Sequence, residues 1–340
     1  MAIVFSGTKL PQAEIAEIQK EIYSDWGTFR DGDIGIEEGF KSGAEVYESK
    51  VSVNMAAYSS GPVAAGADTL DVDRSVVNLT KVQFADVIDY NVLLDTRFER
   101  SMAAGAFNTV SSEFDNAVLQ DISPAIAQTM EDVTWDGDTA AHKVLVAALV
   151  PGAAQGSISA GAQTLVAAMP VNLVSSLPAI ILENNSQAKV VPGAGLGDYK
   201  KVLTIAAITS ATIAAEYAKL YAVLDPKVLA KEDVTIFALL AHLQLMKIAN
   251  NSVGAASNQN FLIEGDKVSY NGITVKFKPL VGFMIAAPGK YLKILFDLAN
   301  DMNVLETGKM ANGADTYFYK NVQAFATWCT NQRYITLYGG

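Results

Sequence analysis

Two residue types that carry much of enzyme chemistry are scarce in this sequence. It has one cysteine, Cys329, and two histidines, His142 and His242, among 340 residues. A single cysteine excludes both an internal disulfide and a cage of thiolate metal ligands, and it is typical of a reducing compartment. A Ser-His-Asp or Cys-His mechanism would need one of the two histidines, and no G-x-S-x-G motif accompanies them. We expect neither histidine to be catalytic.

Charged residues are also few, and most of them are acidic. They make up 18% of the chain, against 50% hydrophobic residues, and the formal net charge is -11. Proteins bind nucleic-acid phosphates through clusters of lysine and arginine. The best candidate for such a cluster in this sequence has only three residues, Lys276, Lys278 and Lys290. The composition predicts a folded globular protein that does not bind nucleic acid sequence-specifically.

One long stretch, from Val144 to Leu182, has no charged residue at all. Uncharged runs longer than about 18 residues are candidates for membrane spans, but Pro151, Pro170 and Pro178 interrupt this one. We therefore expect loop and buried sheet here, and no membrane span. The N-terminus has neither a basic leader nor an apolar run of signal-peptide length, so secretion by that route is not indicated.

Four acidic residues surround Trp135, namely Glu131, Asp132, Asp136 and Asp138. A calcium loop of the EF-hand type needs a bidentate glutamate at its twelfth position, and counted from Asp132 that position is a lysine. We therefore interpret the stretch as the end of a helix followed by an Asp-Gly turn. No metal ligand, cofactor-binding residue or catalytic residue is predicted anywhere in the chain.

Two other patterns have simpler explanations than ligand binding. The glycines of VVPGAGLGD lack the spacing of a dinucleotide or phosphate loop, so a turn is expected there. The aromatic residues of the C-terminal third lack interleaved lysine and arginine, so we assign them to sheet core or a subunit interface rather than to a base-stacking platform. The residues concerned are Gly193, Gly195 and Gly197, and Tyr317, Phe318, Tyr319, Phe325, Trp328, Tyr334 and Tyr338.

Hydrophobic periodicity predicts the main elements of the first half. Residues 11–26 form a short amphipathic helix, and two alternating runs within 45–82 form a long hairpin around a Gly-Pro tip. Apolar residues then recur every three or four positions across 112–134, as in one long helix. Pro124 lies inside this stripe, so the helix is either kinked there or broken, with Ser123 capping a second helix. The unbroken register favours the kink.

The second half alternates between helices and strands. A helix over 210–225 has Ile213, Tyr217, Leu220 and Leu224 on one face. A short buried strand, DVTIF, and a third helix, ALLAHLQLMKIANN, follow it. From Phe261 to the end the alternation is that of strands, so the chain belongs to the α+β class.

This order of parts, with no catalytic set, resembles the major capsid proteins of tailed bacteriophages, whose fold is shared by encapsulins and the shell floor of herpesviruses. The resemblance implies an N-terminal arm, an extended β-hairpin loop, a long spine helix, and peripheral and axial domains. The turn at 136–138 is similar to the one that follows the spine in this family. Gly272 and Val275 occupy the places of its late G-x-x-V strand.

The resemblance also implies domain boundaries. Residues 1–44 are the arm and the start of the peripheral domain, 45–82 the extended loop, and 83–143 the peripheral domain with the spine helix. Residues 144–340 are the axial domain with late peripheral strands. Within it, 144–200 has no counterpart in the family and is interpreted as an insertion.

By the same resemblance the protein is not an enzyme but a structural subunit, assembled in the host bacterial cytoplasm and found in the virion. It would form pentamers and hexamers of an icosahedral head shell around packaged DNA. Expected partners are copies of itself, a separate scaffolding protein, a portal and decoration proteins. Some family members cross-link an extended-loop lysine to a neighbour; Lys50 and Lys81 are eligible by position alone, and no reaction is predicted.

Two alternatives stay open. An encapsulin-like compartment shell would have the same fold and a different content. From another class, an α+β enzyme using two carboxylates, such as a glycosidase, is compatible with the abundance of aspartate and glutamate.

Overall fold

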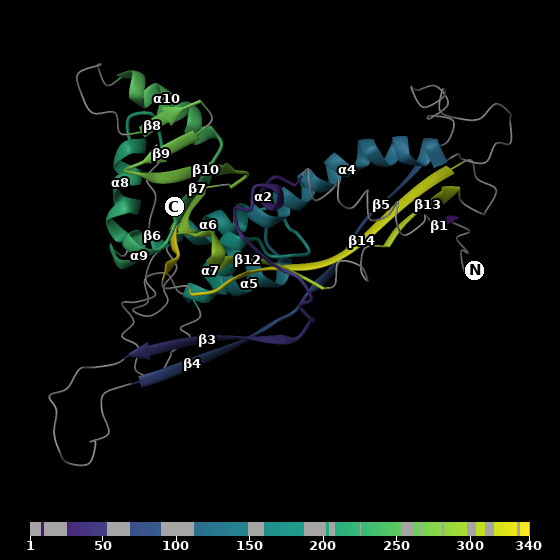
Figure 1. Cartoon of the computed structure of the whole chain (residues 1–340), viewed down its shortest axis with the longest axis horizontal. Coiled ribbons are helices and arrows are strands. Elements are labelled where there is room, and N and C mark those ends of the chain that lie inside the picture. Colours follow the sequence, from purple (N-terminus) through teal and green to yellow (C-terminus); the bar gives the residue numbers. More distant parts are fainter. Residues whose placement is uncertain are drawn as a thin grey trace, which may run out of the picture. The chain divides into compact units, whose positions relative to one another are not determined.

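A computed structural model describes residues 8–9, 26–52, 69–89, 112–148, 160–186, 202–203, 208–224, 226–252, 261–265, 267–280, 282–297, 304–309, 316–331 and 334–339 (Figure 1). These residues belong to two compact units. The first unit takes in Met1–Lys41, Leu79–Val133 and Ile294–Ala326; the second takes in Ser42–Asn78, Thr134–Lys293 and Thr327–Gly340. The helix predicted at 11–26, apart from Trp26, and the glycines of VVPGAGLGD lie outside the described residues.

The first unit is built on a sheet in which β14, the longest described strand, is central. The strand order is β1-β13-β14-β12-β2, and β5 also pairs with β14. β13 and β5 are both antiparallel to β14, with Gly308 opposite Phe318 and Phe84 opposite Asn321. The strands are β1 Thr8–Lys9, β2 Gly35–Glu37, β5 Thr80–Asp89, β12 Leu292–Phe296, β13 Val304–Lys309 and β14 Thr316–Cys329.

The helix predicted over 112–134 is confirmed as α4, Ser112–Trp135. Its buried residues Ser123, Ile126, Ala127 and Met130 recur at the three- and four-residue spacing of one helical face. The helix runs through Pro124 without a break, so the alternative of a second helix capped by Ser123 is wrong. Pro124 itself is exposed.

A second, larger sheet forms the framework of the second unit. Its order is β6-β15-β11-β7-β10-β9-β8, and β7 and β10 run parallel while β11 is antiparallel to β7. β11, which lies between β15 and β7, is buried at every position, so both faces of the sheet are covered there. The strands are β6 Val202–Leu203, β7 Val234–Leu239, β8 Phe261–Glu264, β9 Lys267–Tyr270, β10 Ile273–Lys278, β11 Phe283–Pro288 and β15 Thr336–Gly339.

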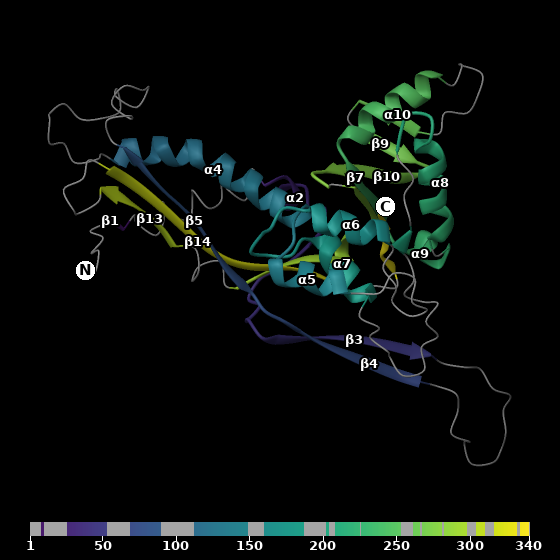
Figure 2. The ribbon, with the colours of Figure 1, turned by 180° about the vertical axis from the view of Figure 1, so that it is seen from behind.

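Helices cover the two faces of this sheet. On one face, α8 (Ile213–Val223) and α10 (Ala241–Ser252) lie beside the sheet (Figures 1 and 2). Their buried apolar side chains belong to one core cluster with those of β7, β9 and β10. The predicted stripe of α8 is confirmed, since Ile213, Tyr217, Leu220 and Leu224 are all buried. α8 ends at Val223, and Pro226 begins the next helix, α9 (Pro226–Lys231). A single 3-10 turn, η3, occupies Gly289–Tyr291.

The uncharged span contains helices, so the prediction of loop and buried sheet for 144–182 is wrong. α5 is Ala140–Ala148, α6 is Ala160–Ala168 and α7 is Leu177–Ser186. α5 and α6 are rich in alanine, which has the highest helix propensity. Pro178 lies in the first turn of α7, where proline is tolerated. Because the span has no charged residues, its solvent-facing positions do not stand out in the sequence, and a helical period could not be detected. None of the helices in the described ranges is long and apolar enough to cross a membrane.

The predicted hairpin is confirmed as β3 (Ala44–Ser52) and β4 (Thr69–Val77), which pair antiparallel along their whole length. They form a sheet of two strands, and within the described chain neither strand pairs with any other. Val77, at the base, is buried, whereas Tyr47 and Val76 are exposed. The tip of the hairpin lies outside the described residues.

Candidate functional site

The four acidic residues around Trp135 do not converge on one point. The Glu131 carboxylate accepts hydrogen bonds from the Thr28 backbone N–H (2.9 Å) and hydroxyl (2.7 Å). In this way it satisfies donors in α2 (Gly27–Arg30), whose own N-cap residue, Trp26, provides no side-chain cap. Asp132 is exposed and accepts a hydrogen bond from Gln128. Among the residues the structure describes, no group of three or more His, Cys, Asp or Glu side chains is placed to hold a metal ion.

The turn that follows α4 requires a glycine. Gly137 has φ +107°, and a Cβ added there would lie 1.8 Å from Asn172 Nδ2 and 2.6 Å from Asn172 Cγ. Asn172 is placed by its own hydrogen bond, because its Nδ2 donates to the Asp136 carbonyl at 2.9 Å. The Gly137 carbonyl accepts from the Ser176 amide at 3.1 Å. The helix end and Asp-Gly turn predicted from the sequence are therefore present, and the turn is held by the segment before α7.

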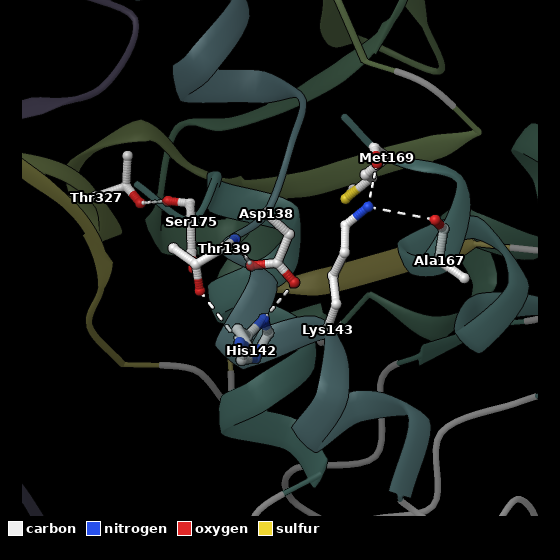
Figure 3. A network of polar contacts seen from close by, with 8 residues as sticks. All are labelled: Asp138, Thr139, His142, Lys143, Ala167, Met169, Ser175 and Thr327. Carbon is white, nitrogen blue, oxygen red and sulfur yellow. Dashed lines mark hydrogen bonds and ion pairs between the residues drawn. The ribbon is translucent and has the colours of Figure 1, made fainter. Parts of the chain in front are cut away.

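Asp138 continues this turn and is completely buried. Its backbone forms a parallel bridge with Val171, in which its amide donates to the Pro170 carbonyl and its carbonyl accepts from the Asn172 amide. One carboxylate oxygen accepts from the Thr139 amide at 2.8 Å, and the other is in contact with Nδ1 of His142 (Figure 3). The buried acid thus has a close partner on the first turn of α5.

The first turn of α5 is capped and tied to α6. The Thr139 hydroxyl accepts a hydrogen bond from the His142 amide at 3.2 Å, which is the geometry of an N-cap. Lys143 points its ammonium at the end of α6, donating to the carbonyls of Ala167 (3.2 Å) and Met169 (Figure 3). A cation at a helix C-terminus is favourable for the helix dipole and satisfies carbonyls that the helix leaves unpaired. We call the set Gly137, Asp138, His142, Lys143 and Asn172 the turn clasp.

The contacts of the turn clasp hold the turn, α5 and α6 together. Asp138 and His142 form a buried pair that joins the turn to the first turn of α5. Neither the pairing of Asp138 with His142 nor the role of Lys143 was predicted from the sequence. The spacing of four between Asp138 and His142 was a usable signal, because residues four apart lie on one helical face.

His242, the other histidine, is buried in the core of the second unit. Its Nδ1 lies 3.3 Å from the hydroxyl of Tyr217, which is fully buried and whose pKa burial raises well above its usual range. Burial also lowers the pKa of His242 to about 4, since a charged imidazolium is disfavoured in an apolar core. It packs as a neutral core residue on α10.

The thin basic cluster does not form a phosphate-binding surface. Lys278 is buried with its ammonium 5.7 Å above the ring of Trp135, which itself packs on Phe237 of the sheet. Lys290 is paired with Glu232. Lys81 is exposed on β5, and the side chain of Lys50 lies outside what the structure describes.

Part of the aromatic group belongs to the sheets, as predicted. Phe318 and Phe325 on β14 and Tyr338 on β15 are buried, and Phe325 packs against Phe296 with ring centroids 6.2 Å apart.

The chain is similar to known proteins in its fold, but no sequence family matches it. No protein-family model matches the chain, and no curated protein matches it. Among solved structures, the capsid of an empty GTA particle matches 100% of this chain and 93% of its own, with a TM-score of 0.52 and 9% identity. The capsid of the native GTA particle gives the same coverage, a TM-score of 0.51 and 10% identity. The chain has a capsid fold.

A third match is the capsid structure of the cyanophage P-SCSP1u, with 11% identity, a TM-score of 0.47 and coverage of 100% of this chain and 90% of that one. The α+β class and the resemblance in fold to capsid proteins, expected from the order of parts in the sequence, are confirmed.

Gly137→Ala is expected to lower the free energy of unfolding by about 3 kcal/mol, because the new methyl group overlaps Asn172 and the residue must keep a positive φ. Denaturant unfolding of the purified protein measures the change. Gly265→Ala is the matched control, since Gly265 has φ +62° and nothing within 4 Å of an added Cβ. It should cost only about 1 kcal/mol. Equal losses in the two variants would contradict the steric role of Asn172.

His242 should make the protein less stable in mild acid. The unfolded chain binds a proton near pH 6.5 and the folded chain only near pH 4, so stability is complete above the first value and falls as the pH drops toward the second. The loss should reach about 2 kcal/mol at about pH 5. His242→Phe should remove this part of the pH dependence, measured as the difference in unfolding free energy between pH 7 and pH 5. A variant with the slope of the wild type would contradict the assignment.

Proposed function

We propose that this chain is a structural, non-enzymatic subunit that self-assembles into the icosahedral head shell of a tailed phage around its packaged DNA. The observation that carries the proposal is the capsid fold over the whole length of the chain. Pentamers and hexamers are the expected intermediates, and the virion is the expected location after assembly in the host cytoplasm. Within this proposal the arm and the start of the peripheral domain are residues 1–44, the extended loop 45–82, the peripheral domain with the spine helix 83–143, and the axial domain with late peripheral strands 144–340.

The hairpin β3–β4 supports this proposal on physical grounds. A two-stranded hairpin is marginally stable alone, and within the described chain these strands pair only with each other. Tyr47 and Val76 expose apolar surface on it. Laid across a neighbouring copy, such a hairpin would bury that surface and become part of an obligate interface.

The charge of the chain fits a container for DNA. With a net charge of -11, and with Lys278 and Lys290 engaged by Trp135 and Glu232, the wall would repel a packaged genome and let it move without sticking. A scaffolding protein, a portal and decoration proteins are the further partners we expect.

The two alternative functions, a compartment shell and an enzyme, would require different features of the protein. An encapsulin-like compartment has the same fold and would hold a cargo enzyme instead of DNA. A carboxylate-dependent enzyme needs two acids free to flank a substrate, whereas Glu131 is engaged by Thr28 and Asp138 by Thr139 and His142. Glu131 and Asp138 therefore are not the two free acids that such an enzyme would use.

Size-exclusion chromatography with light scattering, followed by negative-stain imaging, tests the proposal. We expect rings of five or six subunits, or closed shells. A 36.2 kDa species that stays monomeric at high protein concentration and moderate salt would contradict it.

Changing the hairpin surface should uncouple folding from assembly. Tyr47→Ala combined with Val76→Ala removes exposed apolar groups that would be buried on a neighbour, so the chain should fold and shell formation should fall. Light scattering measures assembly and circular dichroism measures folding. Val87→Ala, at another exposed position on β5, is the control that should assemble normally. Undiminished assembly of the double variant would argue against a hairpin contact.

A further inference from the structure

Four large apolar side chains of the uncharged span are exposed to solvent. Val144 and Leu145 on α5 are 69% and 58% exposed, and Val171 and Leu173, between α6 and α7, are 67% and 65% exposed. Monomeric proteins expose such side chains singly, but a group of them is typical of an interaction site. We call these four residues the uncharged surface.

The elements that carry the uncharged surface are linked to one another. The bridge between Asp138 and Val171 joins the start of α5 to the segment after α6. Gln163 on α6 donates its side-chain amide to the Val146 carbonyl of α5 at 3.0 Å. The turn clasp therefore holds all four residues on one connected part of the second unit.

The part of the sequence that contains this surface has no charged side chains that would have to be buried with the apolar groups. The sequence has no charged residue from Val144 to Leu182. Lys143, the nearest cation in the chain, directs its ammonium to the carbonyls of Ala167 and Met169. Three of the other exposed apolar residues have a charged neighbour in the sequence: Tyr47 lies next to Glu48, Val87 next to Asp86, and Ile248 next to Lys247. Leu240 and Leu262 are exposed without one, but they do not lie in a long uncharged span.

This distribution of charge points to a particular partner. Two chains that each carry a net charge of -11 repel one another, and taking unpaired carboxylates into an interface costs more still. The cores of protein interfaces are accordingly depleted of charged residues. We infer that the uncharged surface is a contact between copies of this chain, the place where two strongly acidic subunits can meet without burying charge. The inference rests on the proposed function and adds to it the residues of one contact.

A contact of this kind has a distinctive response to salt. The repulsion between the acidic subunits is screened when ionic strength rises, while a contact without ion pairs has no attraction to lose. Assembly should therefore need less protein at about 0.5 M salt than at about 0.05 M. An interface built on ion pairs would respond in the opposite direction.

The test uses the full-length protein and variants that add charge to the surface. Val171→Glu combined with Leu173→Glu should raise the protein concentration needed for assembly at least about tenfold, because each copy would bury new carboxylates. Val144→Glu combined with Leu145→Glu should do the same from α5, and it provides a second variant should the first disturb the turn clasp. Light scattering over a concentration series measures the effect, and circular dichroism confirms that each variant is folded.

The matched control is Leu240→Glu combined with Leu262→Glu. Leu240 and Leu262 lie in the same unit and are 63% and 57% exposed, but they are outside the uncharged surface, so this variant should assemble like the wild type. Folded variants of the uncharged surface that assemble as readily as the wild type would overturn the inference. A control that loses assembly to the same extent would overturn it too. A wild-type chain that never assembles would instead count against the proposed function.

Discussion

The second unit depends on one backbone turn. At Gly137 the chain leaves α4 with a positive φ, and an asparagine side chain occupies the space that any Cβ would need. Every other contact of the turn clasp follows from this geometry. It allows the Asp138 backbone to pair with 170–172, the Asp138 carboxylate to reach the first turn of α5, and Lys143 to meet the end of α6. Trp135, just before the turn, is then free to pack on the sheet at Phe237.

Burying Asp138 is tolerable because its polar atoms are occupied. A carboxylate taken out of water needs hydrogen bonds or an opposite charge, and Asp138 has the amide of Thr139 and the imidazole of His142. The same rule explains Glu131 in the first unit, whose two oxygens each accept a hydrogen bond from Thr28. Acidic residues that are crowded in the sequence are separated in the fold: Glu131 binds the first turn of α2, and Asp138 the first turn of α5.

Much of the fold could be predicted because periodicity reflects burial directly. The stripe of α4 and that of α8 were visible as apolar residues three and four apart, and the hairpin as alternation between Val51 and its neighbours. The span from 144 to 182 was not predictable in this way, because alanine is neither clearly polar nor clearly apolar and no charges mark a solvent face. The turn clasp was only partly predictable. Asp138 and His142 are four residues apart, but Asn172 and the carbonyls of 167–170 are brought in by tertiary packing, which leaves no local pattern.

The hairpin has a consequence for the chain before it meets other copies. Each of its two strands has one outer edge that, within the described residues, pairs with no other strand, and such edges are templates for β-aggregation. The strands carry Glu45, Glu48 and Lys50 on one side of the loop and Asp71, Asp73 and Arg74 on the other, and charges of this kind discourage indiscriminate strand addition. Because these charges oppose strand addition at the open edges, overproduced protein that has not yet met other copies should stay soluble instead of accumulating as β-rich aggregate.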